Sequence, residues 1–138
     1  MPEREDAVET ALRALRFRDR SGAELDARLE RRGVGEAARE RALETLERVG
    51  YVDDGRFART RAEQLASRGS GDALIRHDLE QRGVAADHVE AAIAALEPER
   101  ERAERIVAQR GPGARTARYL GARGFGEDAV QSAVAQTG

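Results

Sequence analysis

The stretch GYVDDGRFA, residues 50–58, joins two copies of one helical pattern and decides how the chain is divided. It opens with a glycine of the kind found just past a helix C-terminus. Asp53 is placed to cap the next helix, with Asp54 in the first turn near the positive end of the helix dipole. We therefore expect a helix–helix connector whose two aromatic residues, Tyr51 and Phe57, anchor it in the core.

Apolar residues recur at helical spacing on both sides of this connector. Ser21 followed three residues later by Glu24 forms a capping box, which predicts the start of a helix there. Gly111-Pro112-Gly113 interrupts the pattern later in the chain, and nothing alternates as a strand does. The sequence predicts nine helices: about 6–18, 21–32, 36–49 and 53–67, then one with Ile75 and Leu79 that ends at Gly83, one around Val89 to Leu96, one from Pro98 to Arg110, one ending at Gly124 and one to the C-terminus.

One motif occurs three times, as LERRGV at 29–34, LEQRGV at 79–84 and LGARGF at 120–125. Leucine, arginine, glycine and an apolar residue stand at the same offsets in each copy. One unit of three short helices has too small a core to be stable alone, so neighbouring units must share burial. We predict an all-α fold of three tandem three-helix repeats, residues 1–50, 51–96 and 97–138, forming an elongated, curved array.

Composition excludes several classes of chemistry. The chain has 138 residues, a net charge of -2 and no cysteine, and all 24 of its basic residues are arginine. Mechanisms that need a lysine or a thiolate are therefore excluded, as are disulfides. No apolar run is long enough to span a membrane, and the N-terminus does not resemble a signal peptide. We expect a soluble, cytoplasmic protein.

Candidate catalytic or metal-binding groups are few. His77 and His88 fall on different predicted helices without metal-ligand spacing, and solvated or half-buried helix positions explain them better. Asp53 and Asp54 could hold a magnesium ion, although two carboxylates at a helix start need no metal. The glycine-rich breaks lack the strand and residues of a phosphate loop. We expect no catalytic residue, cofactor or metal, and no enzymatic activity.

The distribution of charge is more informative. No acidic residue occurs between Arg105 and Gly126. The basic and aromatic residues of this run are Arg105, Arg110, Arg115, Arg118, Tyr119 and Arg123. It is either an ordinary solvated face or a surface that binds nucleic-acid phosphate or an acidic protein. The slightly acidic balance of the whole chain disfavours a dedicated nucleic-acid-binding domain.

Several pieces at matching separations resemble the RecX family. They are FRDRS at 17–21 with Glu24-Leu25, Gly33, GYVDD at 50–54 with Phe57-Ala58, and Gly71 with Ile75, Leu79 and Gly83-Val84. The resemblance covers roughly residues 11–96, with the remainder fitting more loosely. Two positions depart from the family pattern: Ser70 stands where an aromatic or apolar residue is common, and Arg39 where an apolar residue is usual.

The resemblance implies a regulator of the recombinase RecA. Such proteins bind the RecA–single-stranded-DNA filament along its groove and restrain its ATPase, strand-exchange and coprotease activities, without a catalytic site of their own. The arginine run of the third repeat is the expected contact, with Arg18, Arg20 and Arg56 as further candidates. We expect a monomer whose direct binding to DNA is weak.

Two rival readings remain at this point. A helix-turn-helix protein that binds DNA without RecA would need one recognition helix with several groove-facing polar side chains, and usually a dimer. A helical scaffold without a nucleoprotein partner would explain the fold but not the arginine run. Binding to bare DNA, compared with RecA-coated DNA, distinguishes the first rival from the RecA regulator.

Overall fold

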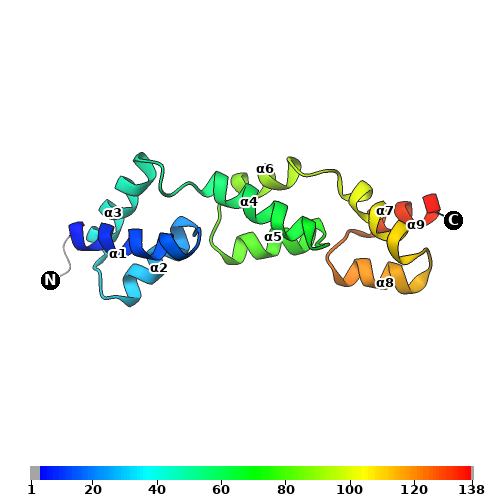
Figure 1. Cartoon of the computed structure of the whole chain (residues 1–138), viewed down its shortest axis with the longest axis horizontal. Coiled ribbons are helices and arrows are strands. Elements are labelled where there is room, and N and C mark those ends of the chain that lie inside the picture. Colours follow the sequence, from blue (N-terminus) through cyan, green and yellow to red (C-terminus); the bar gives the residue numbers. More distant parts are fainter. Residues whose placement is uncertain (1–3, 138) are drawn as a thin grey trace.

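A computed structural model describes the backbone of residues 4–137 and the side chains of residues 7–135. This part of the chain contains nine α-helices and no strand (Figure 1), so the predicted all-helical fold is confirmed. The helices are α1 Arg4–Phe17, α2 Gly22–Arg31, α3 Glu36–Arg48, α4 Asp54–Ser67, α5 Asp72–Gln81, α6 Ala86–Ala94, α7 Glu99–Arg110, α8 Ala114–Ala122 and α9 Glu127–Thr137.

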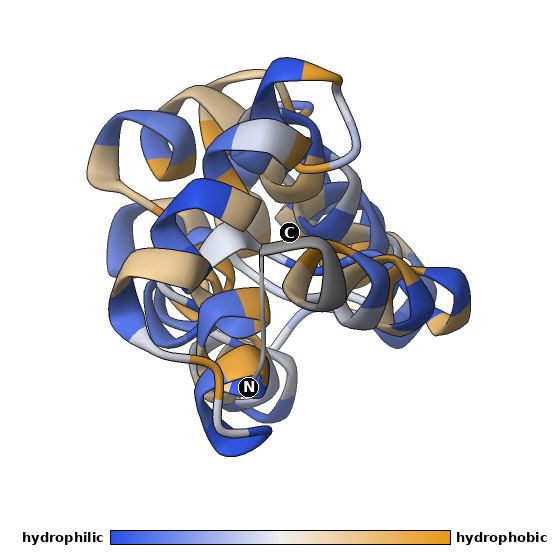
Figure 2. Ribbon diagram, turned by 90° about the vertical axis from the view of Figure 1, so that its left-hand side faces the viewer, coloured by the Kyte–Doolittle hydropathy of each residue, from blue (hydrophilic) through white to orange (hydrophobic). Residues whose placement is uncertain are grey.

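The helices form three groups in a row along the long axis of the molecule (Figure 1). We call them repeat 1 (α1–α3), repeat 2 (α4–α6) and repeat 3 (α7–α9). Each group has its own cluster of buried side chains, centred on Leu25 and Leu29, on Ile75 and Leu79, and on Leu120. Hydrophobic and hydrophilic stretches alternate along the helical ribbons in Figure 2, as in amphipathic helices.

The repeated motif forms the turn that ends the middle helix of each repeat. In repeat 2 the backbone N–H of Val84 donates to Leu79 O at 3.1 Å, and that of Gly83 donates to Glu80 O at 3.0 Å. This is the Schellman arrangement, in which the glycine adopts positive φ. Gly83 has a φ of 77°. Leu79 and Val84 are both buried, so the leucine and the apolar residue of the motif close the core around the turn.

Two polar side chains begin helices as the sequence predicts. Ser21 and Glu24 form the complete capping box at the start of α2, and Ser21 is fully buried. The Asp53 carboxylate accepts a hydrogen bond from the backbone N–H of Arg56 at the start of α4. This backbone hydrogen bond also holds the pKa of Asp53 below its ordinary value.

The expectation for the connector is half right. Phe57 is buried in the core of repeat 2, but Tyr51 is 58% exposed and does not anchor the connector. Val52 is buried in its place, because successive residues of an extended connector point to opposite sides and only one of them can face the core. Val49, placed by its spacing on the apolar face of α3, is also exposed, since α3 ends before it at Arg48.

The two departures from the family pattern make polar contacts of different kinds. Arg39 lies across the gap between α2 and α3, where its Nε is 2.9 Å from Asp26 Oδ1 and a terminal nitrogen donates to Val34 O at 2.8 Å. Ser70 is 2% exposed, and its carbonyl accepts a hydrogen bond from Arg102. Polar contacts therefore replace apolar packing at Arg39, whereas the contact at Ser70 is made by the backbone and does not account for the serine side chain.

Candidate partner-binding surface

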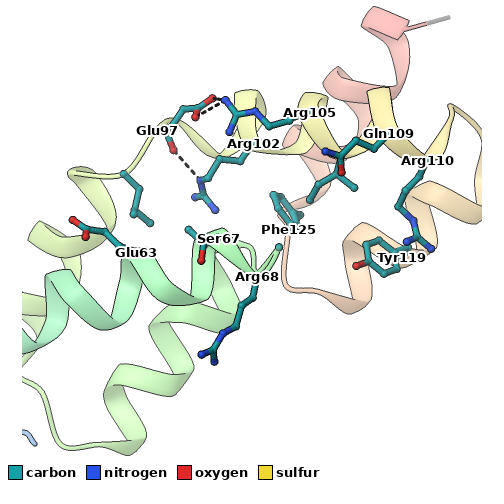
Figure 3. A pocket seen from close by; sticks show the side chains of 14 residues that line it. Glu63, Ser67, Arg68, Glu97, Arg102, Arg105, Gln109, Arg110, Tyr119 and Phe125 are labelled. Atoms are coloured by element: carbon teal, nitrogen blue, oxygen red, sulfur yellow. Dashed lines mark hydrogen bonds and ion pairs between the residues drawn. The ribbon is translucent and has the colours of Figure 1, made fainter. Parts of the chain in front are cut away.

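A groove of about 450 Å³ lies between repeat 2 and repeat 3. The end of α4, the connector after α6, and helices α7 and α8 surround it (Figure 3). Among its lining residues are Glu63, Arg68, Leu96, Glu97, Arg102, Arg105, Ile106, Gln109, Arg110, Tyr119 and Phe125. We call it the repeat 2–3 groove. Three residues of the predicted basic run, Arg105, Arg110 and Tyr119, meet here.

Arg110 and Tyr119 form one unit on the repeat 3 side of the groove. The guanidinium carbon of Arg110 lies 3.7 Å from the centre of the Tyr119 ring, and Figure 3 shows the two side chains stacked together. A cation over an aromatic face is attracted by the ring quadrupole. The stack fixes the orientation of an exposed arginine without neutralising its charge, so Arg110 remains able to bind an anion.

Arg105 is already paired with a carboxylate. One of its terminal nitrogens lies 2.6 and 2.7 Å from the two oxygens of Glu97, at the top of the groove in Figure 3. The Arg105 side chain is 63% exposed, and exposed pairs of this kind contribute little stability. An incoming carboxylate or phosphate can therefore compete with Glu97 for it.

Arg102 belongs to the interior of the groove and was not predicted from the sequence. Its side chain is 7% exposed and donates to Glu97 O and to Ser70 O, each at 2.9 Å. It also pairs with the Asp72 carboxylate and lies over the Phe125 ring, 5.8 Å from the centroid. Because all its hydrogen bonds connect repeats 2 and 3 or their connector, Arg102 holds the walls of the groove together. Nothing in the sequence distinguishes it from the other arginines.

Arg68 was also missed. It stands at the C-terminal end of α4, far from the basic run in sequence, yet it lines the same groove. Its side chain points away from the floor of the groove in Figure 3 and has no ion-pair partner among the described residues. The floor itself is apolar, with Leu96, Ile106 and Phe125 contributing. The groove thus combines an apolar floor with cationic edges.

The rest of the basic run divides into two kinds of residue. Arg123 is turned inward, where it donates to Arg68 O at 2.8 Å and to Gly69 O at 3.4 Å, so it joins repeat 3 to repeat 2. Arg115 and Arg118 are exposed on α8 and have no hydrogen-bond partner among the described side chains. They lie outside the groove lining, but Arg115 is one helical turn before Tyr119 and shares its face.

The predicted candidates in the first two repeats are dispersed. Arg18 lines a smaller cleft of about 160 Å³ between repeats 1 and 2. Arg20 donates to Ala14 O at 3.4 Å, and partial burial, together with the nearby Arg18 and Arg28, lowers its pKa. Arg56 donates to Gly50 O at 3.1 Å, in the connector that follows α3. The structure gives Arg20 and Arg56 local structural contacts; whether they also bind a partner stays a prediction.

Groups that could bind a metal are not brought together. No cluster of three or more histidine, cysteine, aspartate or glutamate side chains suited to a metal occurs within the described residues. His77 and His88 are both exposed. Asp54, the other half of the magnesium alternative, instead accepts a hydrogen bond from the backbone N–H of Gly22 at 2.8 Å. Among the described helices, none combines the length and apolar character needed to cross a membrane.

Comparison with known proteins shows which family has this architecture. A profile of the second three-helix domain of RecX matches residues 53–93, which contain most of repeat 2. Regulatory protein RecX of Deinococcus radiodurans is 32% identical over 96% of this chain and 68% of its own length. Regulatory protein RecX of Halorhodospira halophila is 34% identical over 92% of this chain and 85% of its own length. The chain belongs to the RecX family. The RecX relatives are named regulatory proteins rather than enzymes.

Solved RecX structures share the fold. The crystal structure of RecX from Lactobacillus salivarius superimposes with a TM-score of 0.84 over 97% of this chain and 96% of its own, at 16% identity. A second RecX crystal structure gives a TM-score of 0.80 over 93% of this chain and 71% of its own, at 19% identity. The row of three-helix repeats is therefore the RecX fold.

Proposed function

We propose that this protein regulates RecA by binding the RecA–single-stranded-DNA filament and lowering its ATPase, strand-exchange and coprotease activities. Membership of the RecX family supplies the partner. The observation that supports the contact is the repeat 2–3 groove, where the guanidinium groups of Arg105 and Arg110 lie beside the apolar side chains of the floor. A filament presents protein carboxylates and DNA phosphates, and a guanidinium can pair with either in a bidentate fashion.

The contact surface extends from the groove onto α8. Tyr119 connects the two parts, because it stacks with Arg110 inside the groove and shares a helix face with Arg115. Arg118 lies beside it in sequence. An elongated row of repeats suits a filament, since it offers a long surface instead of a single pocket (Figure 1).

The test measures RecA ATPase on single-stranded DNA at substoichiometric amounts of the protein. We expect the parent protein to inhibit, and the Arg115→Glu, Arg118→Glu double variant to inhibit markedly less. Changing the same pair to lysine should have a milder effect, because the charge remains and only the planar fork is lost. Inhibition by the parent should weaken with added salt, over a Debye length of about 8 Å at physiological ionic strength.

A matched control uses two other exposed arginines. Arg41 and Arg48 lie on α3, in repeat 1, and their change to glutamate alters the net charge by the same amount. This double variant should inhibit RecA as the parent does. Equal inhibition by the parent and the Arg115→Glu, Arg118→Glu variant would show that the α8 face is ordinary solvated surface. Nanomolar binding to bare duplex DNA by a protein that leaves RecA unaffected would favour the helix-turn-helix alternative.

A further inference from the structure

The repeats are joined in the same way at both of their junctions. The turn after the middle helix of one repeat packs on the start of the middle helix of the repeat before it. At the first joint, Ser21 Oγ donates to Arg82 O at 2.6 Å. At the second joint, the backbone N–H of Gly71 donates to Arg123 O at 2.8 Å. Ser21 and Gly71 stand at equal distances before the repeated leucine of their helices.

The glycine of each turn allows this close approach. A Cβ atom on Gly83 would overlap the Cβ of Ala23, and one on Gly124 would lie 2.6 Å from the Cβ of Leu74. Both glycines also have positive φ. A side chain at either position would therefore push the two repeats apart as well as strain the turn.

A carboxylate completes each joint. Asp54, the first residue of α4, accepts from the backbone N–H of Gly22 at 2.8 Å. Glu99, the first residue of α7, accepts from the backbone N–H of Asp72 at 2.6 Å. Each middle helix of repeats 1 and 2 thus has one of its first N–H groups paired with a carboxylate of the repeat that follows.

The last repeat keeps the same surface uncovered. At the start of α8, Gly113 provides no side-chain cap. Counted from the repeated leucine, Gly113 and Ala114 correspond to Gly22 and Ala23, although α8 begins at Ala114, one residue later than α2 and α5 begin relative to their leucines. Beside them, α8 and α9 form an apolar groove of about 370 Å³, which also includes Ala117, Val130 and Val134. We call this surface the open joint.

The helix pair that forms the open joint differs from its counterparts in repeats 1 and 2. There, ion pairs cross from the second helix to the third: Asp26 with Arg39 at 2.9 Å, and Arg76 with Glu90 at 2.7 Å. In repeat 3 the place of Asp26 and Arg76 is taken by Ala117. Among the described side chains, no ion pair crosses from α8 to α9 at this place.

The first repeat carries a turn of the kind that would fit this surface, and this turn packs on no other repeat among the described residues. Its turn Arg32-Gly33-Val34 has the same Schellman hydrogen bonds as the turns at the two joints. No atom lies within 4 Å of the place where a Cβ on Gly33 would stand. Among the described residues, the turn of repeat 1 and the start of α8 therefore both lack the partner that their counterparts have at the two joints.

We propose that a second copy of this chain docks its Arg32-Gly33-Val34 turn on the open joint, so that molecules associate head to tail. The occupant is a second copy because this chain already makes the same contact twice within itself. Arg32 would donate to carbonyls just after α7, as Arg123 does to the carbonyls of Arg68 and Gly69 just after α4. Such a contact is heterologous and does not close, so it extends into a row instead of stopping at a dimer.

The association should be weak in dilute solution. The internal joints are helped by short connectors, which give an effective concentration in the range of about millimolar. In addition, Arg115 occupies the repeat position that Glu24 occupies in α2. At the first joint, Glu24 forms an ion pair with Arg82, with 2.9 Å between nitrogen and oxygen. Arg32 would thus face a like charge. The protein is then a monomer when dilute, as the sequence predicts, and self-association should strengthen with salt, opposite to the salt response expected for RecA binding.

Sedimentation equilibrium over a concentration series up to about 1 mM tests this. We expect the average mass to rise above the monomer value of 15.1 kDa and to continue past twice that value. Arg115→Glu should strengthen association about tenfold, since it restores the carboxylate that Arg82 has at the first joint. Ala114→Arg should weaken association about tenfold by filling the open joint.

Ala122→Arg is the matched control, because Ala122 is exposed at the other end of α8 and receives the same charge. It should leave association unchanged. A mass that stays at the monomer value even for Arg115→Glu would overturn the proposal. So would association that stops at a dimer, or that Ala114→Arg and Ala122→Arg affect equally. None of these measurements involves RecA, so their outcome is independent of the proposed function.

Discussion

At the scale of single residues, Leu79 is the leucine of the repeated motif that packs in the core of repeat 2. It is fully buried, and its carbonyl accepts the N–H of Val84. Leu79→Ala should lower the free energy of unfolding by about 2–5 kcal/mol, the usual cost of a cavity left by a buried leucine. Denaturant unfolding measures this. Leu43→Ala, at a position that is only partly buried, should cost less, and a loss of a few tenths for Leu79→Ala would contradict the packing described.

Arg102 is the residue whose loss should do most damage between repeats. Arg102→Leu keeps an apolar stem but leaves the Asp72 carboxylate and two carbonyl groups without their partner. Breaking one side of a buried pair typically costs about 3–5 kcal/mol. Thermal unfolding should show the loss, whereas Arg100→Leu, at a side chain that is 59% exposed, should change stability little. Similar melting temperatures for the two variants would exclude a structural role for Arg102.

At the scale of helices, Asp78 on α5 connects two elements. Burial alone would raise its pKa, but hydrogen bonds from Arg61 on α4 and from Arg82 outweigh this and hold the pKa below the ordinary 3.8. The unfolded chain therefore binds the proton first as the pH falls. The stabilisation is fully present above the unfolded-state pKa and is lost as the pH falls through the lower folded-state pKa.

The lowered pKa of Asp78 predicts how the free energy of unfolding changes at acidic pH. Between about pH 5 and pH 2, the free energy of unfolding should fall more steeply for the parent than for Asp78→Asn, which has no proton to bind there. Denaturant midpoints at several pH values measure the two slopes. The replacement costs stability at neutral pH as well, so the slopes and not the absolute values are compared. Equal slopes would mean that the carboxylate is not held ionised by Arg61 and Arg82.

The sequence predicts those features that depend on residues close together in the chain, and it does not predict those that depend on packing between distant segments. Glycines, caps and leucines at helical spacing act locally, so the nine helices and their turns could be predicted. The choice between Tyr51 and Val52 as core residue depends on the path of the connector, which spacing does not determine. The charge run indicated Arg105, Arg110 and Tyr119 as a site. Arg68 joins them only through packing between repeats, so no local pattern could reveal it.

At the scale of the whole molecule, the joints decide how the repeats are arranged and hence whether the surface between them exists. The two walls of the repeat 2–3 groove come from different repeats. Glu99 is central to this arrangement, because its carboxylate accepts from the backbone N–H of Asp72 at 2.6 Å and from that of Gly126 at 3.1 Å. It connects the start of α5 to the turn before α9.

Glu99→Ala should therefore change the arrangement of the repeats more than their helices. The circular dichroism spectrum should stay nearly the same, since each repeat keeps its own core, while losing the cap of α5 should cost about 1 kcal/mol. Small-angle scattering should report a changed distribution of distances, and RecA inhibition should weaken although every arginine of the groove remains. Glu101→Ala removes the same charge from an exposed position in the first turn of α7 and should do neither. If Glu99→Ala leaves both scattering and inhibition as in the parent, the second joint does not depend on this carboxylate, and the contacts of Arg102 and Arg123 hold repeats 2 and 3 in register without it.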